Sequence, residues 1–226
     1  MSRVPGIALE EPAEPEAAGF VLAGGLSSRM GQDKSMVLLD GQPMISYPLA
    51  ALRQAALPAS IAGGQPSLAA FAPLIEDTHP GLGPLAGICS SLGSTAARRA
   101  VFLSVDAPFI PASLLRVFVR HAAITSAVIT VPSINGFAQT FPAVLDRSVA
   151  PLLEEQLHSA RRGCFSAFQA AASALGQPIT VLPVEYLVQA GQVSHPRSLP
   201  ACRWFLNLNR EEDLSRAEIH GRALIA

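Results

Sequence analysis

Several short segments of the chain are almost entirely apolar, and segments with helical periodicity separate them. The clearest are residues 19–23, 100–105 and 127–132. Continuous apolar runs of this length are typical of strands buried on both faces, and such strands occur in parallel sheets that helices cover on each side. The pattern therefore predicts an α/β protein in which a mostly parallel sheet is the middle of three layers.

The remaining elements are predicted from weaker patterns. Further strands are expected at residues 60–62, 179–184 and 204–208. Helices are expected at residues 44–57, 84–92, 111–123, 148–160 and 165–175, and Asn209 is expected to open a last one. Pro48 should kink or delay the first helix, a turn is expected at residues 40–43, and residues 189–202 form the longest expected loop.

The length and charge of the chain limit what it can be. Its 226 residues suffice for one domain, and we expect a flexible tail at residues 1–18, rich in Pro, Ala and Glu, followed by a single domain at 19–226. Only 15% of the residues are charged and the net charge is −1. A chain so close to neutral is not expected to bind nucleic acid or an anionic membrane over a broad surface. An anionic ligand would need a few well-placed groups.

The cysteines indicate a reducing compartment. Cys89, Cys164 and Cys202 are widely spaced and show no metal-ligand spacing, so we expect packing residues and neither a zinc site nor a disulfide framework. The amino-terminal segment lacks the apolar core of a signal peptide, and no run approaches the roughly 18 apolar residues of a membrane helix. We therefore expect a cytoplasmic protein.

A glycine-rich segment, LAGGLSSRMGQDK, spans residues 22–34 at the end of the first predicted strand. Gly24 and Gly25 allow the backbone to approach a ligand closely, and successive N–H groups in such a loop can cradle phosphate. Arg29 and Lys34 add two positive charges. The spacing matches neither a Walker A loop nor a GxGxxG motif. We predict a phosphate-binding loop, with an ordinary strand-to-helix turn as the alternative.

Asp106 directly follows the predicted strand at residues 100–105. Ligands of parallel α/β sheets bind beyond the carboxyl ends of the strands, and a carboxylate there can hold a hard cation such as Mg²⁺. Because Pro108 and Pro111 follow, capping of the next loop or helix is the alternative role. The glycine loop and Asp106 together favour a site for a metal-bound phosphate.

Three other patterns carry weaker signals. The sequence GLGPLA at residues 81–86 fits GxGxxA, but it follows no adjoining apolar strand and contains a proline, so a loop leading into a helix is the better interpretation. Asn207 follows the last predicted strand and is a candidate to face the ligand crevice, whereas Asn209 is expected to cap a helix. The pair Arg161-Arg162 is expected at a solvated helix end.

These motifs together resemble the molybdenum cofactor guanylyltransferase family, the MobA-like nucleotidyltransferases. The glycine segment is similar to the family pattern L-A-G-G-x-S-x-R-M-G-x-D-K. Further matches follow in the family's order: LDGQPM at 39–44, IED at 75–77, GPLAGI at 83–88, VDAPFIP at 105–111 and FLNLN at 205–209.

The resemblance implies a three-layer, Rossmann-like nucleotidyltransferase fold. It also implies a reaction in which GTP and molybdopterin, or its molybdenum form, give the guanine dinucleotide cofactor and pyrophosphate in the presence of Mg²⁺. By position, Lys34 binds the phosphates, Asp77 the nucleoside, and Asp106 both the nucleotide and the metal. The other nucleotide contacts come from the glycine loop: Leu22, Ala23 and Gly24 by position, with Gly25 and Arg29 added for their place in the loop. Arg29, Lys34 and Asp106 are then the expected catalytic residues.

GTP and molybdopterin are the implied small-molecule partners, and a molybdenum-insertion protein or a molybdoenzyme chaperone is the implied protein partner. The chain departs from the family at two positions. Ala62 stands where the family has an Asn that contacts the nucleotide, and Phe141-Pro142 stands where it has His-Pro. A CTP-dependent cytidylyltransferase, a nucleotidyltransferase for another phosphorylated acceptor, and a nucleotide-binding module without catalysis therefore stay open as alternatives.

Overall fold

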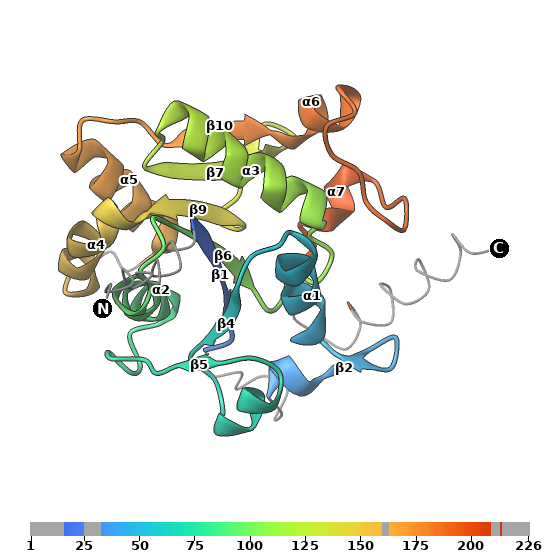
Figure 1. The fold of residues 1–226 in the computed structure, drawn as a ribbon, viewed down its shortest axis with the longest axis horizontal. Coiled ribbons are helices and arrows are strands. Elements are labelled where there is room, and N and C mark those ends of the chain that lie inside the picture. The colour runs from blue at the N-terminus through green and yellow to red at the C-terminus, as the bar shows by residue number, and fades with distance from the viewer. Residues whose placement is uncertain (1–15, 25–32, 160–162, 209–212, 214–226) are drawn as a thin grey trace, which may run out of the picture.

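The computed structural model describes residues 16–24, 33–159, 163–208 and 213. Within them, an eight-stranded sheet is the middle layer and helices cover both faces (Figure 1). The strand order is β10-β7-β9-β6-β1-β4-β5, with β8 paired to β7. The strands are β1 (Ala17–Leu22), β4 (Ala59–Ala62), β5 (Leu74–Ile75), β6 (Arg99–Ser104), β7 (Ile129–Ile134), β8 (Phe137–Ala138), β9 (Ala143–Asp146) and β10 (Thr180–Pro183). A separate hairpin pairs β2 (Leu38–Leu39) with β3 (Gln42–Pro43).

The sheet is mostly parallel, as predicted. Strand β1 runs parallel to β4 and β6, β4 to β5, and β7 to β10. Strand β9 is antiparallel to both β6 and β7, which makes β6 and β7 parallel to each other. No sequence pattern predicted β9. Its insertion keeps the carboxyl ends of β6 and β7 at the same edge of the sheet.

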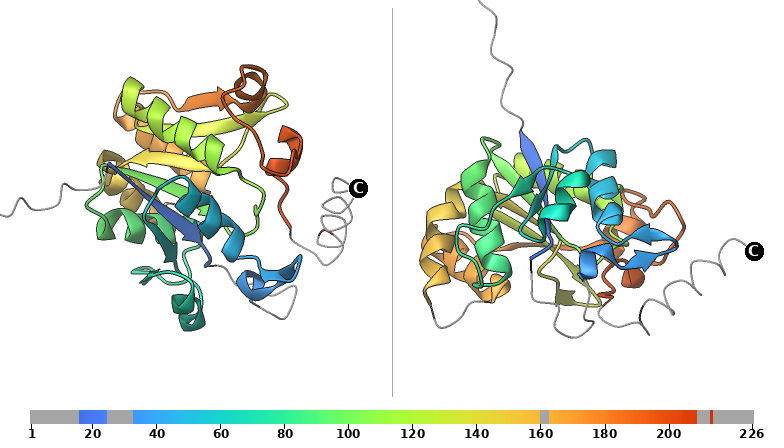
Figure 2. Two further views of the ribbon diagram at one scale, coloured as in Figure 1. Left: turned by 45° about the vertical axis from the view of Figure 1, so that its right-hand side comes forward. Right: turned by 90° about the horizontal axis from the view of Figure 1, so that it is seen from below.

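The helices divide between the two faces (Figure 2). One face is covered by α1 (Ser46–Gln54), α3 (Ala112–Thr125), α6 (Val184–Gln189) and α7 (Ala201–Trp204). The other face is covered by α2 (Pro84–Ser94), α4 (Ala150–Leu157) and α5 (Cys164–Ala174). In the described part of the chain, three short 3-10 helices lie in the connections: η1 (Lys34–Met36), η2 (Pro66–Ala70) and η3 (Arg147–Val149). No helix among the described residues is long and apolar enough to cross a membrane.

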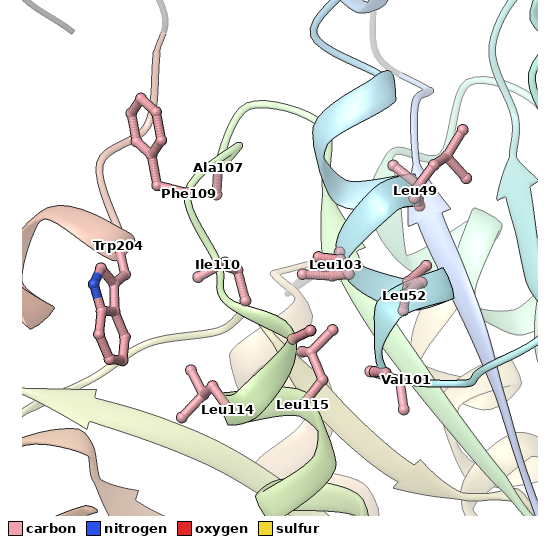
Figure 3. Packing of buried hydrophobic residues seen from close by; sticks show 14 of the residues in the cluster. Leu49, Leu52, Val101, Leu103, Ala107, Phe109, Ile110, Leu114, Leu115 and Trp204 are labelled. Carbon is pink, nitrogen blue, oxygen red and sulfur yellow. The ribbon is translucent and has the colours of Figure 1, made fainter. Parts of the chain in front are cut away.

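Strand β6 shows why the predicted strands had to be apolar throughout. Val101 and Leu103 pack into the cluster formed with α1 and α3, and Phe102 packs into the cluster on the opposite face. Figure 3 shows Leu103 facing the α1 side chains Leu49 and Leu52. Because alternate residues of one strand enter two different cores, no position in the middle of β6 can be polar without losing burial on one side.

The structure corrects several expected boundaries. Ala17 and Ala18, assigned to the tail, are buried in β1. Helix α1 begins at Ser46, which leaves Pro48 in its first turn, where the missing N–H has no intrahelical acceptor. The expected strand at 204–208 is wrong, because α7 ends at Trp204 and irregular backbone follows. Predictions for residues 1–15, Asn209 and Arg161-Arg162 lie outside the described residues.

The long loop predicted at 189–202 is confirmed between α6 and α7, and it packs back onto the body of the protein. Arg197 forms an ion pair with Asp40 in the β2–β3 turn at 3.1 Å, and its guanidinium lies 5.5 Å from the centre of the Phe109 ring. The His195 ring lies 6.1 Å from Trp204, which is buried. The loop therefore joins the β2–β3 hairpin to the segment that follows β6.

We expect the free energy of unfolding to fall as the pH drops from about 6.5 to about 4, because burial and the nearby Arg197 charge lower the pKa of His195 from 6.5 to about 4. In that window the folded His195 stays neutral while the unfolded chain binds a proton, so added protons favour unfolding. Thermal melts of the unaltered protein and of His195→Asn between pH 7 and 4 measure the effect. Asn retains an acceptor for the Arg197 N–H, and the variant should show the weaker pH dependence. Equal pH dependence in the two proteins would contradict a neutral His195.

Candidate functional site

The loops that follow β1, β4 and β6 meet at the carboxyl edge of the parallel strands. Backbone hydrogen bonds continue past the strand ends there: the Val105 N–H donates to the Leu22 carbonyl at 3.2 Å, and the Ala23 N–H donates to the Ala62 carbonyl at 3.1 Å. From β1 the chain proceeds outward through β4 and β5, then returns to the other side of β1 as β6. The edge between β1 and β6 is therefore a topological switch point, the position at which open α/β sheets bind ligands.

The glycine loop begins against the turn that follows β4. A Cβ atom at Gly63 would lie 3.3 Å from the Gly24 Cα, and Gly63 has a φ of +71°. A side chain at Gly63 would therefore force the Gly24 backbone to shift by a few tenths of an ångström, whereas a Cβ at Gly24 would make ordinary contacts at 3.9 Å. Gly63 was not among the predicted site residues, although a glycine doublet directly after a predicted strand is the kind of signal that marks such a turn.

Lys34 and Asp106 come together at this edge. Lys34 opens η1, which Asp33 caps by accepting a hydrogen bond from the Ser35 N–H at 3.0 Å. The Lys34 Nζ lies 3.7 Å from the Asp106 Oδ2, and the two side chains retain 18% and 23% of their exposure. A partly exposed pair of this kind offers a cationic donor and an anionic acceptor to a ligand that replaces one of them. The structure therefore brings the two predicted residues together, and their roles as phosphate-binding lysine and metal-binding carboxylate stay predictions.

Asp106 does not act as the helix cap that was its alternative role. Helix α3 has Pro111 at its N-cap position and no side-chain capping bond. The Asp106 main-chain carbonyl accepts a hydrogen bond from the Leu208 N–H at 2.8 Å, which brings the exposed Asn207 next to the Asp106 backbone. Asn207 thus lies in an irregular segment beside the Asp106 backbone, whereas a position at the end of a strand was predicted.

The other predicted site residues lie around this pair. Leu22 is buried as the last residue of β1, Ala23 is half-buried and Gly24 is exposed. Gly25 and Arg29 lie outside the described residues. Of the two predicted basic residues of the glycine loop, Lys34 lies among the described residues and Arg29 does not.

The residues around Asp106 fit a magnesium ion that a substrate brings with it. No group of three or more His, Cys, Asp or Glu side chains able to hold a metal ion occurs in the described part of the chain. Mg²⁺ is commonly held by one or two carboxylates together with substrate phosphates and waters. The single carboxylate of Asp106 matches that arrangement and does not match a closed all-protein cage.

Asp77 lies farther along the same edge. It follows β5, which is three strands from β6 in the sheet order, or about 14 Å at the usual strand spacing. The Asp77 Oδ1 accepts a hydrogen bond from the His79 N–H at 2.9 Å. A ligand that contacts both Asp77 and the Lys34–Asp106 pair must therefore be elongated and lie across the ends of β4 and β1.

A polar network missed by the sequence analysis holds the Asp77 loop. The His79 Nε2 lies 3.2 Å from the Glu154 Oε1 on α4. The Thr78 N–H donates to the Ser90 Oγ on α2 at 3.0 Å, and the two hydroxyl oxygens are 2.9 Å apart. The loop is thus tied to two helices. The partners are distant in sequence, so no local motif could indicate them.

The two positions that depart from the family pattern are both packed. Ala62 is buried at the end of β4, and a Cβ at Gly87 of α2 would lie 3.6 Å from the Ala62 Cβ. The Phe141 ring packs edge-on against Phe168 of α5, with ring centres 6.5 Å apart. Apolar contacts with the α2 and α5 layer therefore occupy the space around both positions.

The cysteines divide into two groups. Burial raises the pKa of the Cys89 thiol to about 12 and that of Cys164 to about 11, so both stay protonated and act as the packing residues that the sequence predicted. Cys202 is exposed, and its expected packing role is wrong. The sequence at 81–86 enters α2 with Gly83 at the N-cap and proline following, as expected for a loop leading into a helix.

A doubly covered, mostly parallel sheet with a topological switch point defines a Rossmann-like α/β protein, and Lys34 and Asp106 lie at that switch point. Within that class, the chain belongs to the family of MobA-like NTP transferase domains, which it matches over residues 19–178.

Named relatives and solved structures give a consistent picture. A molybdenum cofactor guanylyltransferase of Xanthomonas euvesicatoria pv. vesicatoria is 44% identical over 99 residues, which cover 43% of this chain and 50% of that protein. The chain spans about half the length of the guanylyltransferase relatives it matches. The structure of molybdopterin-guanine dinucleotide biosynthesis protein A from Archaeoglobus fulgidus is similar with a TM-score of 0.71 and 22% identity, covering 91% of this chain and 99% of that chain. For 2-C-methyl-D-erythritol 4-phosphate cytidylyltransferase from Thermus thermophilus the TM-score is 0.61 at 17% identity, covering 92% and 99%. These two likenesses show the fold.

We predict that Gly63→Ala lowers the free energy of unfolding by about 1–2 kcal/mol through its positive φ and also weakens nucleotide binding several-fold, because the new Cβ displaces Gly24. Gly176→Ala is the matched control. Gly176 has a φ of +66°, a Cβ there would meet nothing within 4 Å, and it precedes β10 at the opposite edge of the sheet. Chemical denaturation and titration with a nucleoside triphosphate measure the two effects. Equal losses of affinity in both variants would contradict the proposed role of the Gly24–Gly63 contact.

Proposed function

We propose that this chain transfers GMP from GTP to molybdopterin, or to its molybdenum form, to give the guanine dinucleotide cofactor and pyrophosphate. The observation that carries the proposal is the Lys34–Asp106 pair, with Nζ and Oδ2 3.7 Å apart at the switch point of the sheet. Family membership and relatives named as molybdenum cofactor guanylyltransferases support it.

The edge of the sheet suggests how the nucleotide lies. The triphosphate occupies the crevice between β1 and β6, where Lys34 and the glycine loop meet its charge, and Arg29 of that loop adds a bidentate contact. The nucleoside extends past Gly24 and the turn at Gly63 toward Asp77. This orientation leaves the side of Asp106 that faces β7 and β8 free for the acceptor.

The proposed reaction is an in-line displacement at the α-phosphorus of GTP. An oxygen of the acceptor's terminal phosphate forms the new P–O bond, the bond between the α-phosphorus and the oxygen bridging to the β-phosphate breaks, and pyrophosphate leaves with the electron pair. A phosphate monoester is largely ionised at neutral pH, so the protein needs no general base. Its work is positioning and charge stabilisation.

The chain's own residues supply those two contributions. Lys34 faces the charge that develops on the departing pyrophosphate, and Asp106 with Asn207 provides oxygen ligands at the phosphates. Mg²⁺, when bound, supplies positive charge that polarises the phosphoryl oxygens and holds them in a fixed geometry. The Lys34–Asp106 contact in the free protein keeps both side chains at the reaction centre before substrate arrives.

The same proposal covers the setting of the reaction. Three free cysteines are compatible with a reducing compartment, and we propose the cytoplasm. A dinucleotide cofactor has to be handed to the enzyme that uses it, so a molybdenum-insertion protein or a molybdoenzyme chaperone is the proposed protein partner.

Lys34→Ala and Asp106→Asn are each expected to lower turnover on the order of 10²- to 10³-fold, because each removes a charge placed at the reacting phosphates. Pyrophosphate release with GTP, Mg²⁺ and molybdopterin is the measurement. Asp40→Asn is the matched control, since it also breaks a partly exposed ion pair, with Arg197 at 3.1 Å. Near-normal turnover in a folded Asp106→Asn protein would rule out the role assigned to that carboxylate.

The buried Ala62 favours one second candidate, a cytidylyltransferase. An alanine offers no amide for reading the base, so recognition of guanine must come from elsewhere, and the fold is shared with a solved cytidylyltransferase. Thermal-shift measurements with GTP, CTP, ATP and UTP in the presence of Mg²⁺ decide between them. A nucleotide at a hundred times its Kd stabilises the native state by about 2.7 kcal/mol, and we expect the largest shift with GTP. A larger shift with CTP would replace guanylyl transfer by cytidylyl transfer, and binding without pyrophosphate release would indicate a module that has lost catalysis.

A further inference from the structure

A tight hairpin projects a phenylalanine from the edge of the sheet that carries Asp106. Strands β7 and β8 are joined by the two residues Asn135 and Gly136, whose φ angles are +51° and +80°. Two positive φ angles in a two-residue hairpin loop define a type I′ turn, in which the twist of the turn matches that of the strands. Phe137 follows this turn directly and is paired with Ile134.

Contacts on both sides hold the hairpin in place. The carboxylate of Glu185 on α6 accepts a hydrogen bond from the Asn135 N–H. The Gln139 side chain donates to the Phe137 carbonyl at 3.0 Å, and the Gln139 N–H donates to the Pro132 carbonyl at 2.8 Å. Phe137 is therefore presented by backbone that is fixed before any ligand binds.

The strand register places Phe137 level with the end of β6. Val101 is paired with Val144, and Val144 is paired with Thr130. Val105 lies four residues beyond Val101, and Ile134, the partner of Phe137, lies four residues beyond Thr130 on a strand that runs in the same direction. Phe137 and Val105, the residue before Asp106, thus lie at the same height on the sheet.

Strand β8 also lies on the side of β7 that faces β6. Strand β10 pairs with Thr130 and Ser133 along one side of β7, so β9 at Thr130 and β8 at Ser133 occupy the other. β8 therefore continues the line of β9 toward the edge that carries Asp106. The line formed by β9 and β8 lies one strand spacing from β6, which is about 5 Å where the strands are still paired.

The Phe137 side chain is 73% exposed, although its cross-strand partner Ile134 is buried in the cluster that also contains Leu103 and Val105. Directly paired residues stand on the same face of a sheet, so the exposed ring stands on the same face as that core. The nucleotide would occupy the opposite direction, over β1, β4 and β5. The exposed ring therefore lies on the side left for the acceptor.

We infer that Phe137 is a stacking platform for the planar heteroaromatic ring of the acceptor, and so a residue that determines acceptor specificity. This inference rests on the proposed function. An aromatic face binds a planar heterocycle by stacking without needing a set pattern of hydrogen bonds. The acceptor would then be held at two ends, with its ring on Phe137 and its phosphate at Asp106.

The test compares Phe137→Leu and Phe137→Trp with the unaltered protein. Leu keeps apolar bulk but has no ring face, whereas Trp keeps the ring. The energy of stacking one base on an aromatic ring predicts that Phe137→Leu raises the KM for the acceptor about tenfold. The KM for GTP should not change. In Phe137→Trp the KM for the acceptor should stay close to that of the unaltered protein. Ile124→Ala is the matched control, because Ile124 is 72% exposed near the end of α3 that precedes β7, at the opposite edge of the sheet.

A binding measurement separates failure of this inference from failure of the proposed function. The probe is neopterin monophosphate, a pterin phosphate monoester whose binding is followed by the anisotropy of its own ring fluorescence. If the unaltered protein makes the dinucleotide and Phe137→Leu matches Ile124→Ala in acceptor KM, the inference is wrong and the function stands. If the unaltered protein makes no dinucleotide, the proposed function is wrong, and binding of the probe alone tests the inference about Phe137. Binding weakened in Phe137→Leu and kept in Phe137→Trp then supports the platform, and absent binding or equal affinity in the two variants overturns it.

Discussion

The side-by-side burial of β1 and β6 is the constraint on which the rest of the structure depends. The two strands pair in register over six residues, from Ala17 with Arg99 to Leu22 with Ser104. Because both strands are buried on both faces, a slip of one residue would move every side chain into the wrong core. At the start of the pair, the buried Arg99 guanidinium is matched by Glu16, and removal of that partner would leave a buried charge uncompensated.

This fixed register is what brings sparse charges together. The chain has a net charge of −1 and few charged residues, yet Lys34 and Asp106 meet where β1 and β6 end. A partly exposed ion pair of this kind contributes little to stability. Under the proposed function its position has a reason, because Lys34 is the positive group and Asp106 the oxygen ligand that a metal-bound phosphate would need at one place.

The parts of the fold and site that could be predicted are those encoded locally. The apolar run at residues 100–105 is readable because burial on both faces leaves no alternation, and Asp106 is conspicuous as the carboxylate that ends it. The segment at 204–208 was misread because a short apolar run fits a strand or a buried helical turn equally well. There, docking of Trp204 decides the outcome, with its Nε1–H donating to the Leu199 carbonyl at 2.8 Å.

Other features depend on contacts that no local pattern records. The antiparallel β9 exists because Ala143–Asp146 finds both β6 and β7 beside it, and a short segment of mixed character gives no independent signal.

The two halves of the edge that carries Asp106 are supported by different layers of the molecule. On the side proposed for the nucleotide, the Asp77 loop is tied to α2 and α4 on one face of the sheet. On the side proposed for the acceptor, the β7–β8 hairpin is tied to α6 on the other face. Among the described residues, the β1–β6 pair, with Asp106 at its end, borders both sides. Under the proposed function, substitutions in the hairpin alter recognition of the acceptor without disturbing the nucleotide site, because different helices hold the two sides.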